Sequence, residues 1–192
     1  MKIIILILLL SISSTSFAGG YYSGEYVDEY DQASGLYFKS LKTVTEQGGF
    51  LNISNSIMYS DINIFDPAAN SNVLLFNDQK NRTISSFLYE SGYNEETHSI
   101  QFRTSEDSYN QHHHIKNNHS IEKRAPKDRL LLVVSNEKQK NSTMFSFEKS
   151  GKNMQKIKTF PADVDWHIDV KNAKIRFICN TGNAIKIESL DW

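Results

Sequence analysis

Histidine is concentrated in one short stretch of the sequence. His112 and His114 stand two residues apart, and His119 follows shortly after them. In an extended chain, His112 and His114 project from the same side, as two imidazole ligands of a transition metal must. No carboxylate or cysteine stands at the spacing of an established zinc motif, and the flanking residues are typical of a solvated loop. A metal site formed by His112, His114 and His119 is therefore the alternative to an exposed polar loop.

His167 is the centre of a second candidate site. Asp165 and Asp169 stand two residues before and after it, so a strand places all three side chains on one face. The two carboxylates predict that the charged imidazolium form of His167 is favoured, and such a group can be the general acid of a small hydrolase or lyase. Trp166 and Ile168 alternate with these residues. This pattern favours the simpler interpretation of a half-buried strand with its charged row on the solvent side.

Other signs of catalysis are missing from the sequence. Cys179 is the only cysteine, so no intrachain disulfide can form, and it has no neighbour in the sequence that would activate it. We expect a structural thiol. The chain contains no G-x-S-x-G turn, no glycine-rich phosphate loop, no H-E-x-x-H pair and no C-x-x-C pair. We therefore expect no cofactor and favour a protein that is not an enzyme.

Short apolar or alternating runs, separated by turn residues, predict an all-β fold. The expected strands are residues 36–42, 60–66, 72–76, 83–90, 98–103, 129–135, 143–149, 155–160, 165–170, 174–178 and 184–190. Turn sequences such as Asp-Pro-Ala-Ala-Asn at 66–70 and Ser-Gly-Lys-Asn at 150–153 favour antiparallel hairpins. Apolar residues at every second position predict packing stripes, among them Ile175 with Phe177 and Ile185 with Ile187.

Two parts of the chain resemble each other. Residues 73–92 and 131–151 each contain an apolar strand, a polar loop and a second strand that ends in Ser-Gly. From Asp61 onward, this cadence resembles that of β-propeller repeat proteins, and the resemblance implies a propeller-like arrangement of hairpins. A closed propeller needs at least about four blades, which is more than this length provides. We therefore expect a partial propeller-like domain or a β-sandwich.

The first residues have the features of a secretory signal. Lys2 is followed by an apolar run at residues 3–10 and by a small-x-small site that ends at Ala18. We expect cleavage after Ala18, a tyrosine-rich acidic arm at residues 19–35 and a single β-rich domain at residues 36–192. No cysteine follows the expected cut, and no later segment is long and apolar enough to span a membrane. The prediction is a protein without membrane insertion, located in a periplasm or secreted.

Charge and aromatic composition narrow the class of partner. The formal net charge is −1 with both signs interspersed, which gives no electrostatic case for nucleic acid or a membrane surface. Acidic residues surround Tyr21, Tyr22, Tyr26 and Tyr30, and tyrosines of this kind are favoured where proteins bind one another. We therefore expect a non-catalytic domain that binds another protein in the cell envelope, in the class of immunity proteins or accessory factors. An unclosed sheet edge also makes a homodimer an option.

Overall fold

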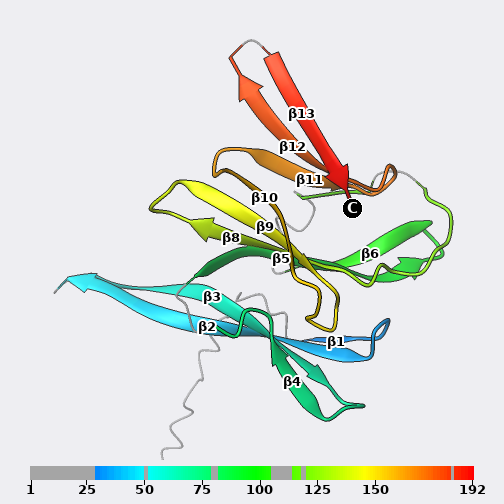
Figure 1. Ribbon diagram of the computed structural model, residues 1–192, viewed down its shortest axis with the longest axis horizontal. Coiled ribbons are helices and arrows are strands. Elements are labelled where there is room, and N and C mark those ends of the chain that lie inside the picture. The colour runs from blue at the N-terminus through cyan, green and yellow to red at the C-terminus, as the bar shows by residue number, and fades with distance from the viewer. Residues whose placement is uncertain (1–28, 50–51, 79–81, 105–113, 118–119, 183) are drawn as a thin grey trace, which may run out of the picture.

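The computed structural model describes residues 29–49, 52–78, 82–104, 114–117, 120–182 and 184–192. Within these residues the chain forms thirteen strands and no helix, so the prediction of an all-β fold is confirmed (Figure 1). No helix in the described part of the chain is long and apolar enough to cross a membrane. The predicted signal segment 1–18 and most of the arm 19–35 lie outside the described residues, so cleavage after Ala18 stays a prediction.

The strands form two sheets. The nine-stranded sheet contains β1 (Glu29–Asp31), β2 (Leu36–Gly49), β3 (Asn52–Asp66), β5 (Thr83–Asn94), β8 (Leu130–Asn136), β9 (Asn141–Phe147) and β10 (Gln155–Pro161) in this order, with β4 (Ser71–Leu74) on β3 and β6 (Ser99–Thr104) on β5. The four-stranded sheet has the order β13 (Ala184–Asp191), β12 (Lys174–Thr181), β11 (Asp165–Asp169) and β7 (Ile115–Lys116). All pairs are antiparallel except β7 with β11.

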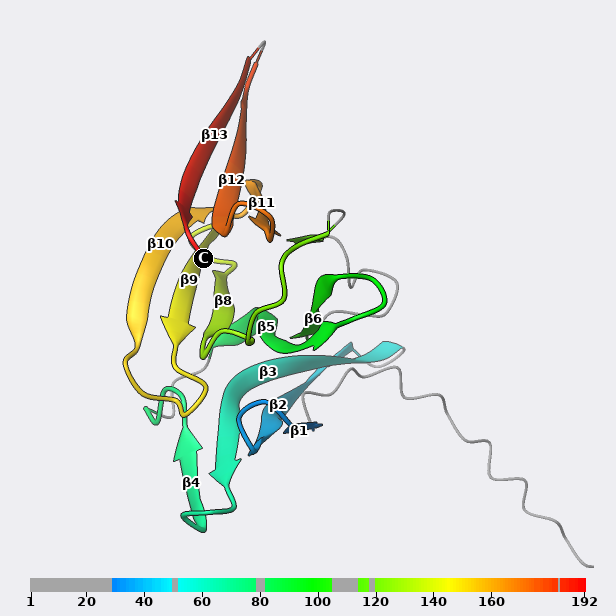
Figure 2. The same ribbon diagram turned by 90° about the vertical axis from the view of Figure 1, so that its right-hand side faces the viewer.

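The layers are those of a sandwich, with two cores that share the strands β5, β8 and β9. β3 and β5 join at a single pair, Tyr59 with Ile84, and the β1–β4 part of the sheet lies beneath the central strands (Figure 2). Leu88 and Leu131 belong to the core beneath β11–β13, whereas Tyr89 and Leu132 belong to the core above β2 and β3. Both faces of these strands are therefore buried, which explains the continuous apolar run in β8.

Local chemistry accounts for the hairpins. After β3, the Asp66 carboxylate accepts the N–H groups of Ala68 at 2.9 Å and Ala69 at 3.2 Å, and Asn70 adopts a φ of 48° before β4 begins. This is the turn that the Asp-Pro-Ala-Ala-Asn sequence predicts. The chain reverses after β1 in a similar way, because Gly35 has a φ of 74° and donates its N–H to the carbonyl oxygen of Asp31 at 2.7 Å.

One predicted packing stripe is wrong. Ile175 and Phe177 are completely buried, as expected, but Ile185 is 69% exposed and Ile187 is 54% exposed. The β12–β13 hairpin extends beyond the rest of the molecule (Figures 1 and 2), and no described residue covers this face of β13. Alternation marks the face to which a residue belongs but does not determine whether another layer lies over it.

Candidate functional site

The predicted metal site is not assembled in the described part of the chain. His112 and His119 lie outside it. The His114 ring stacks on Trp166 with ring centroids 3.9 Å apart, and its Nδ1 atom lies 2.7 Å from the main-chain oxygen of Trp166. An imidazole that donates this hydrogen bond has its Nδ1 atom engaged and unable to ligate a metal. Among the described residues, no group of three His, Cys, Asp or Glu side chains is arranged to hold a metal ion.

The second predicted site lies on β11 as the alternation indicates. Trp166 and Ile168 are buried in the core, while Asp165 is exposed and His167 lies half-buried on the outer face. Asp169 is already engaged: its Oδ2 atom accepts Arg176 Nε at 2.9 Å and Arg176 Nη2 at 2.7 Å. The side chains of Asp165, His167 and Asp169 thus share one face, and one of the two carboxylates has its own cation.

The prediction that His167 favours its charged form is wrong. Burial lowers the pKa of the His167 imidazole, Lys116 and Arg176 lower it further, and Asp169 opposes them only in part. The register across the sheet explains the difference, because Arg176 lies directly opposite His167 and Lys116 lies beside Asp169 on β7. The uncharged imidazole is poorly suited to act as the general acid that the pattern suggests, and the hydrolase alternative centred on His167 stays a prediction.

Only one of the four tyrosines of the predicted binding surface lies among the described residues. Tyr21, Tyr22 and Tyr26 lie outside the described residues, whereas Tyr30 lies on β1 and is 49% exposed. The register places Tyr30 opposite Tyr37 and Tyr37 opposite Phe65, with ring centroids 4.8 Å and 6.2 Å apart. We call Tyr30, Tyr37 and Phe65 the aromatic row. It crosses β1, β2 and β3, strands that lie in the lower part of Figure 1.

Strand alternation fixes which way the aromatic row points. Leu36 and Phe38, the residues on either side of Tyr37, are buried in the core above β2 and β3, which we call the lower core. Tyr37 therefore faces outward with 47% of its surface exposed. On β1, Asp31 is buried next to the exposed Tyr30. The Asp31 carboxylate also accepts the hydroxyl of Ser34 at 2.6 Å, which ties the turn to the strand. The row is therefore held on the outer surface by anchors on the inner one.

Asp31 is the first member of a buried polar network. The ammonium group of Lys149 donates to Asp31 Oδ2 at 2.7 Å and to the main-chain oxygen of Glu90 at 2.6 Å. Both charged side chains are almost wholly buried, with 3% of Lys149 and none of Asp31 exposed. One cation thus joins β1 to the middle of β5 through contacts that no solvent reaches.

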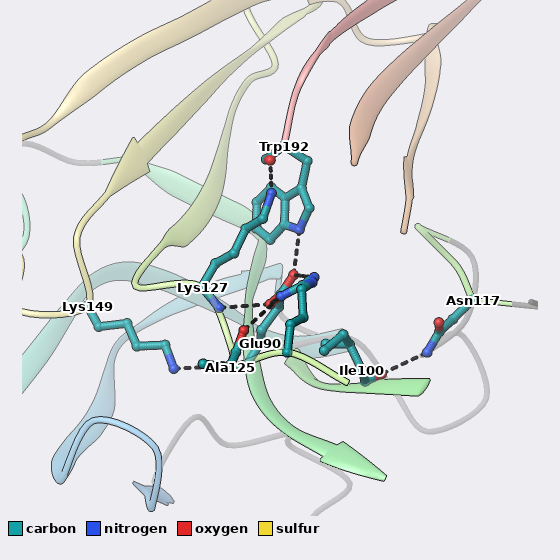
Figure 3. Close-up of polar contacts among 8 residues, drawn as sticks. Glu90, Ile100, Asn117, Ala125, Lys127, Lys149 and Trp192 are labelled. Carbon is teal, nitrogen blue, oxygen red and sulfur yellow. Dashed lines mark hydrogen bonds and ion pairs between the residues drawn. The ribbon is translucent and has the colours of Figure 1, made fainter. Parts of the chain in front are cut away.

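Glu90 is the centre of the same network. Its carboxylate accepts Arg124 Nη1 at 2.5 Å, Arg124 Nη2 at 2.7 Å, the Lys127 N–H at 2.8 Å and Trp192 Nε1 at 2.8 Å (Figure 3). The Lys127 ammonium group in turn contacts the main-chain oxygen of Trp192. Burial raises the pKa of Glu90, but the hydrogen bonds from Arg124, Lys127 and Trp192 outweigh it and hold this pKa below its ordinary value. We call Asp31, Lys149, Glu90, Arg124, Lys127 and Trp192 the anchor cluster.

Reasoning from the sequence missed the anchor cluster. Asp31 and Lys149 are 118 residues apart, and Glu90 and Trp192 are 102 residues apart, so no local spacing connects them. The carboxylates are buried and engaged with cations, which leaves no open position for a substrate. The anchor cluster therefore positions strands, and the aromatic row is the surface that it supports.

Comparison of the chain with protein-family models, with curated proteins and with solved structures finds no match.

Proposed function

We propose that this chain is an exported, non-catalytic domain that binds another protein through the aromatic row. One observation carries the proposal: Tyr30 and Tyr37 lie against each other in register, and nearly half of each side chain is exposed to solvent. Large aromatic side chains left open on a strand surface are enriched where proteins bind, and they contribute much of the binding energy there.

The rigidity of the row favours binding over incidental exposure. Tyr30 is held by its neighbour Asp31, which the Lys149 ammonium group fixes from the inner face, and Tyr37 lies between the buried residues Leu36 and Phe38. A partner therefore meets side chains that are already ordered, and preorganisation lowers the entropy lost on binding. The hydroxyl of each tyrosine adds a hydrogen-bonding group at the edge of the contact.

The sequence suggests where this binding takes place. The signal features that end at Ala18 support export, and the mixed charge gives no reason to expect a nucleic acid or a lipid surface as the ligand. A protein of the cell envelope is the partner that fits both features. Immunity proteins and envelope accessory factors are classes with these properties.

The test is affinity capture from an envelope extract of the source organism, with three forms of the chain. The double variant Tyr30→Ala, Tyr37→Ala removes the row, and Met154→Ala removes a side chain that is 55% exposed elsewhere. We expect the unaltered chain and Met154→Ala to retain the same protein in stoichiometric amount and the double variant to lose it. Metal analysis of the same samples tests the histidine alternative.

Two results would count against the proposal. Retention of the partner by the double variant would assign the binding to another surface. A chain that retains bound metal and no protein would favour the alternative of a metal site formed by His112, His114 and His119. Thermal unfolding of each variant is the control for folding, and the exposure of Tyr30 and Tyr37 predicts little change in it.

A further inference from the structure

β13 is an edge strand with an apolar outer surface. It is the last strand in the order of the four-stranded sheet, and no described residue pairs with its free side. Ile185 and Ile187 are 69% and 54% exposed, and the hairpin that carries them extends beyond the other layers (Figures 1 and 2). An exposed edge of this kind is a ready template for another strand.

The main chain of β13 presents its free groups at known residues. The N–H of Trp192 donates to the carbonyl oxygen of Ala173 at 3.0 Å, in the same register as the rest of the β12–β13 ladder. Bonded and non-bonded pairs alternate along an antiparallel ladder, so every second residue of β13 turns its N–H and C=O away from β12. Counting from Trp192, these residues include Ser189, Ile187 and Ile185.

We propose that β13 pairs antiparallel with β13 of a second copy of this chain, with the two Ile187 residues directly opposite each other. In this register, Lys186 of each copy lies opposite Glu188 of the other, which gives two opposite-charge pairs related by symmetry. Both pairs are non-hydrogen-bonded pairs, in which the side chains are closest. The two four-stranded sheets then become one continuous sheet.

The charges favour this register over the two neighbouring ones. Centring the pairing on Lys186 places two ammonium groups opposite each other, and centring it on Glu188 places two carboxylates opposite each other. Glu188 also contacts the Lys158 side chain, which holds its carboxylate on one face of the hairpin. On the other face, Ile178 lies beside Ile187 in the register, so the two copies join their isoleucines into one apolar patch.

A lysine on an edge strand ordinarily prevents pairing with other strands. Here the residue two positions further along is a glutamate, so the same lysine favours the register centred on Ile187 and opposes the register centred on Lys186. This interface lies on a different sheet from the aromatic row, and it does not depend on the proposed function. The two surfaces can be tested separately.

Sedimentation velocity over a series of concentrations tests the dimer. We expect the purified chain to reach twice the mass of one chain as concentration rises. Lys186→Glu and Glu188→Lys each place like charges opposite each other at both symmetric positions. Each variant is therefore expected to lose at least about tenfold in dimer affinity. An equimolar mixture of the two variants is expected to dimerise again, because each then supplies the charge that the other lacks.

The mixture keeps the test decisive even where a single variant fails to fold, because misfolded chains do not regain a defined dimer on mixing. A chain that stays monomeric at every concentration overturns the proposal. So does a dimer that neither Lys186→Glu nor Glu188→Lys weakens. Tyr30→Ala is the matched control, since it alters the other surface and should leave the dimer unchanged.

Discussion

The ammonium group of Lys149 lies 2.7 Å from the carboxylate of Asp31, and solvent reaches almost nothing of either side chain. Asp31 is on β1, at one end of the nine-stranded sheet, while Lys149 follows β9 near the other end. The ion pair therefore connects the two ends of this sheet across the lower core. It also connects to the main chain of Glu90, so three distant segments depend on a single cation.

Replacing Lys149 by methionine should destabilise the fold strongly. The change preserves much of the side-chain volume but leaves the Asp31 carboxylate buried without a cation. Breaking a buried ion pair in this way lowers the free energy of unfolding by about 3 to 5 kcal/mol. Urea unfolding followed by tryptophan fluorescence measures the loss.

Lys152→Met is the matched control for this experiment, because Lys152 lies three residues further along and is exposed. Its expected effect is within about 0.5 kcal/mol. Adding Asp31→Asn to Lys149→Met removes the uncompensated charge and should recover part of the lost stability. Equal stability of Lys149→Met and Lys152→Met would show that the ion pair contributes nothing to the fold.

Glu90 should make stability depend on pH in the acid range. Burial alone raises its pKa, but the hydrogen bonds from Arg124, the Lys127 main chain and Trp192 lower the pKa below the ordinary value of 4.5. The unfolded chain therefore binds the proton more readily than the folded chain does. The contribution of Glu90 is complete above pH 4.5 and is lost as the pH falls through the lower, folded-state pKa.

Urea unfolding of the unaltered chain and of Glu90→Gln, at several pH values from neutral to acid, tests this linkage. The variant is less stable at neutral pH, since it loses the charge that Arg124 binds. Its stability should also fall less steeply with acid, because the titrating carboxyl group is gone. Parallel curves for the two proteins would contradict the assigned pKa direction.

The His167 imidazole should titrate below its ordinary pKa of 6.5. Burial is the largest cause, and the charges of Lys116 and Arg176 add to it, while Asp169 opposes them. Lys116→Gln should therefore raise this pKa and Asp169→Asn should lower it. NMR titration of the His167 ring protons gives the value directly. A pKa above 6.5 in the unaltered chain would restore the imidazolium that the Asp-His-Asp pattern predicts.

Alternation along the chain was sufficient to predict most strands. Each of the eleven predicted runs overlaps a strand of the structure, because side chains in a strand alternate between two faces and leave this pattern in the sequence. The two short strands β1 and β7 were not predicted. They contain three and two residues, too few for any period to appear.

The candidate site was harder to predict from the sequence, because it depends on contacts between segments that are far apart in the chain. Tyr30 was singled out by composition, but its alignment with Tyr37 and Phe65 follows from the register of three strands. The pKa of His167 depends on Arg176, which lies on the next strand, and on Lys116, which is far away in the sequence. The two carboxylates nearest in the sequence, Asp165 and Asp169, therefore suggested a raised pKa for His167, whereas the structure lowers it.

Gly151 and Gly182 both have a positive φ, but only Gly151 is closely packed, so substitutions at the two positions distinguish the cost of backbone strain from the cost of crowding. Gly151 has a φ of 80°, and a Cβ atom there would lie 3.1 Å from Ile64 Cδ1 and 3.1 Å from Val73 Cγ1. Gly182 has a φ of 63°, and a Cβ atom there would meet nothing within 4 Å. Alanine at either position must adopt the left-handed backbone conformation, which lowers the free energy of unfolding by about 1 kcal/mol. Only Gly151→Ala also crowds the lower core.

We therefore expect Gly182→Ala to lower the free energy of unfolding by about 1 kcal/mol, and Gly151→Ala to lower it by about 1 to 3 kcal/mol more, through overpacking. Urea unfolding of the two variants gives the difference, in which the shared backbone term cancels. The crowding at Gly151 acts on Ile64 and Val73, which lie on β3 and β4. Equal losses in the two variants would mean that these side chains move aside without cost, and that the turn after β9 is not packed against β3 and β4 as tightly as the distances indicate.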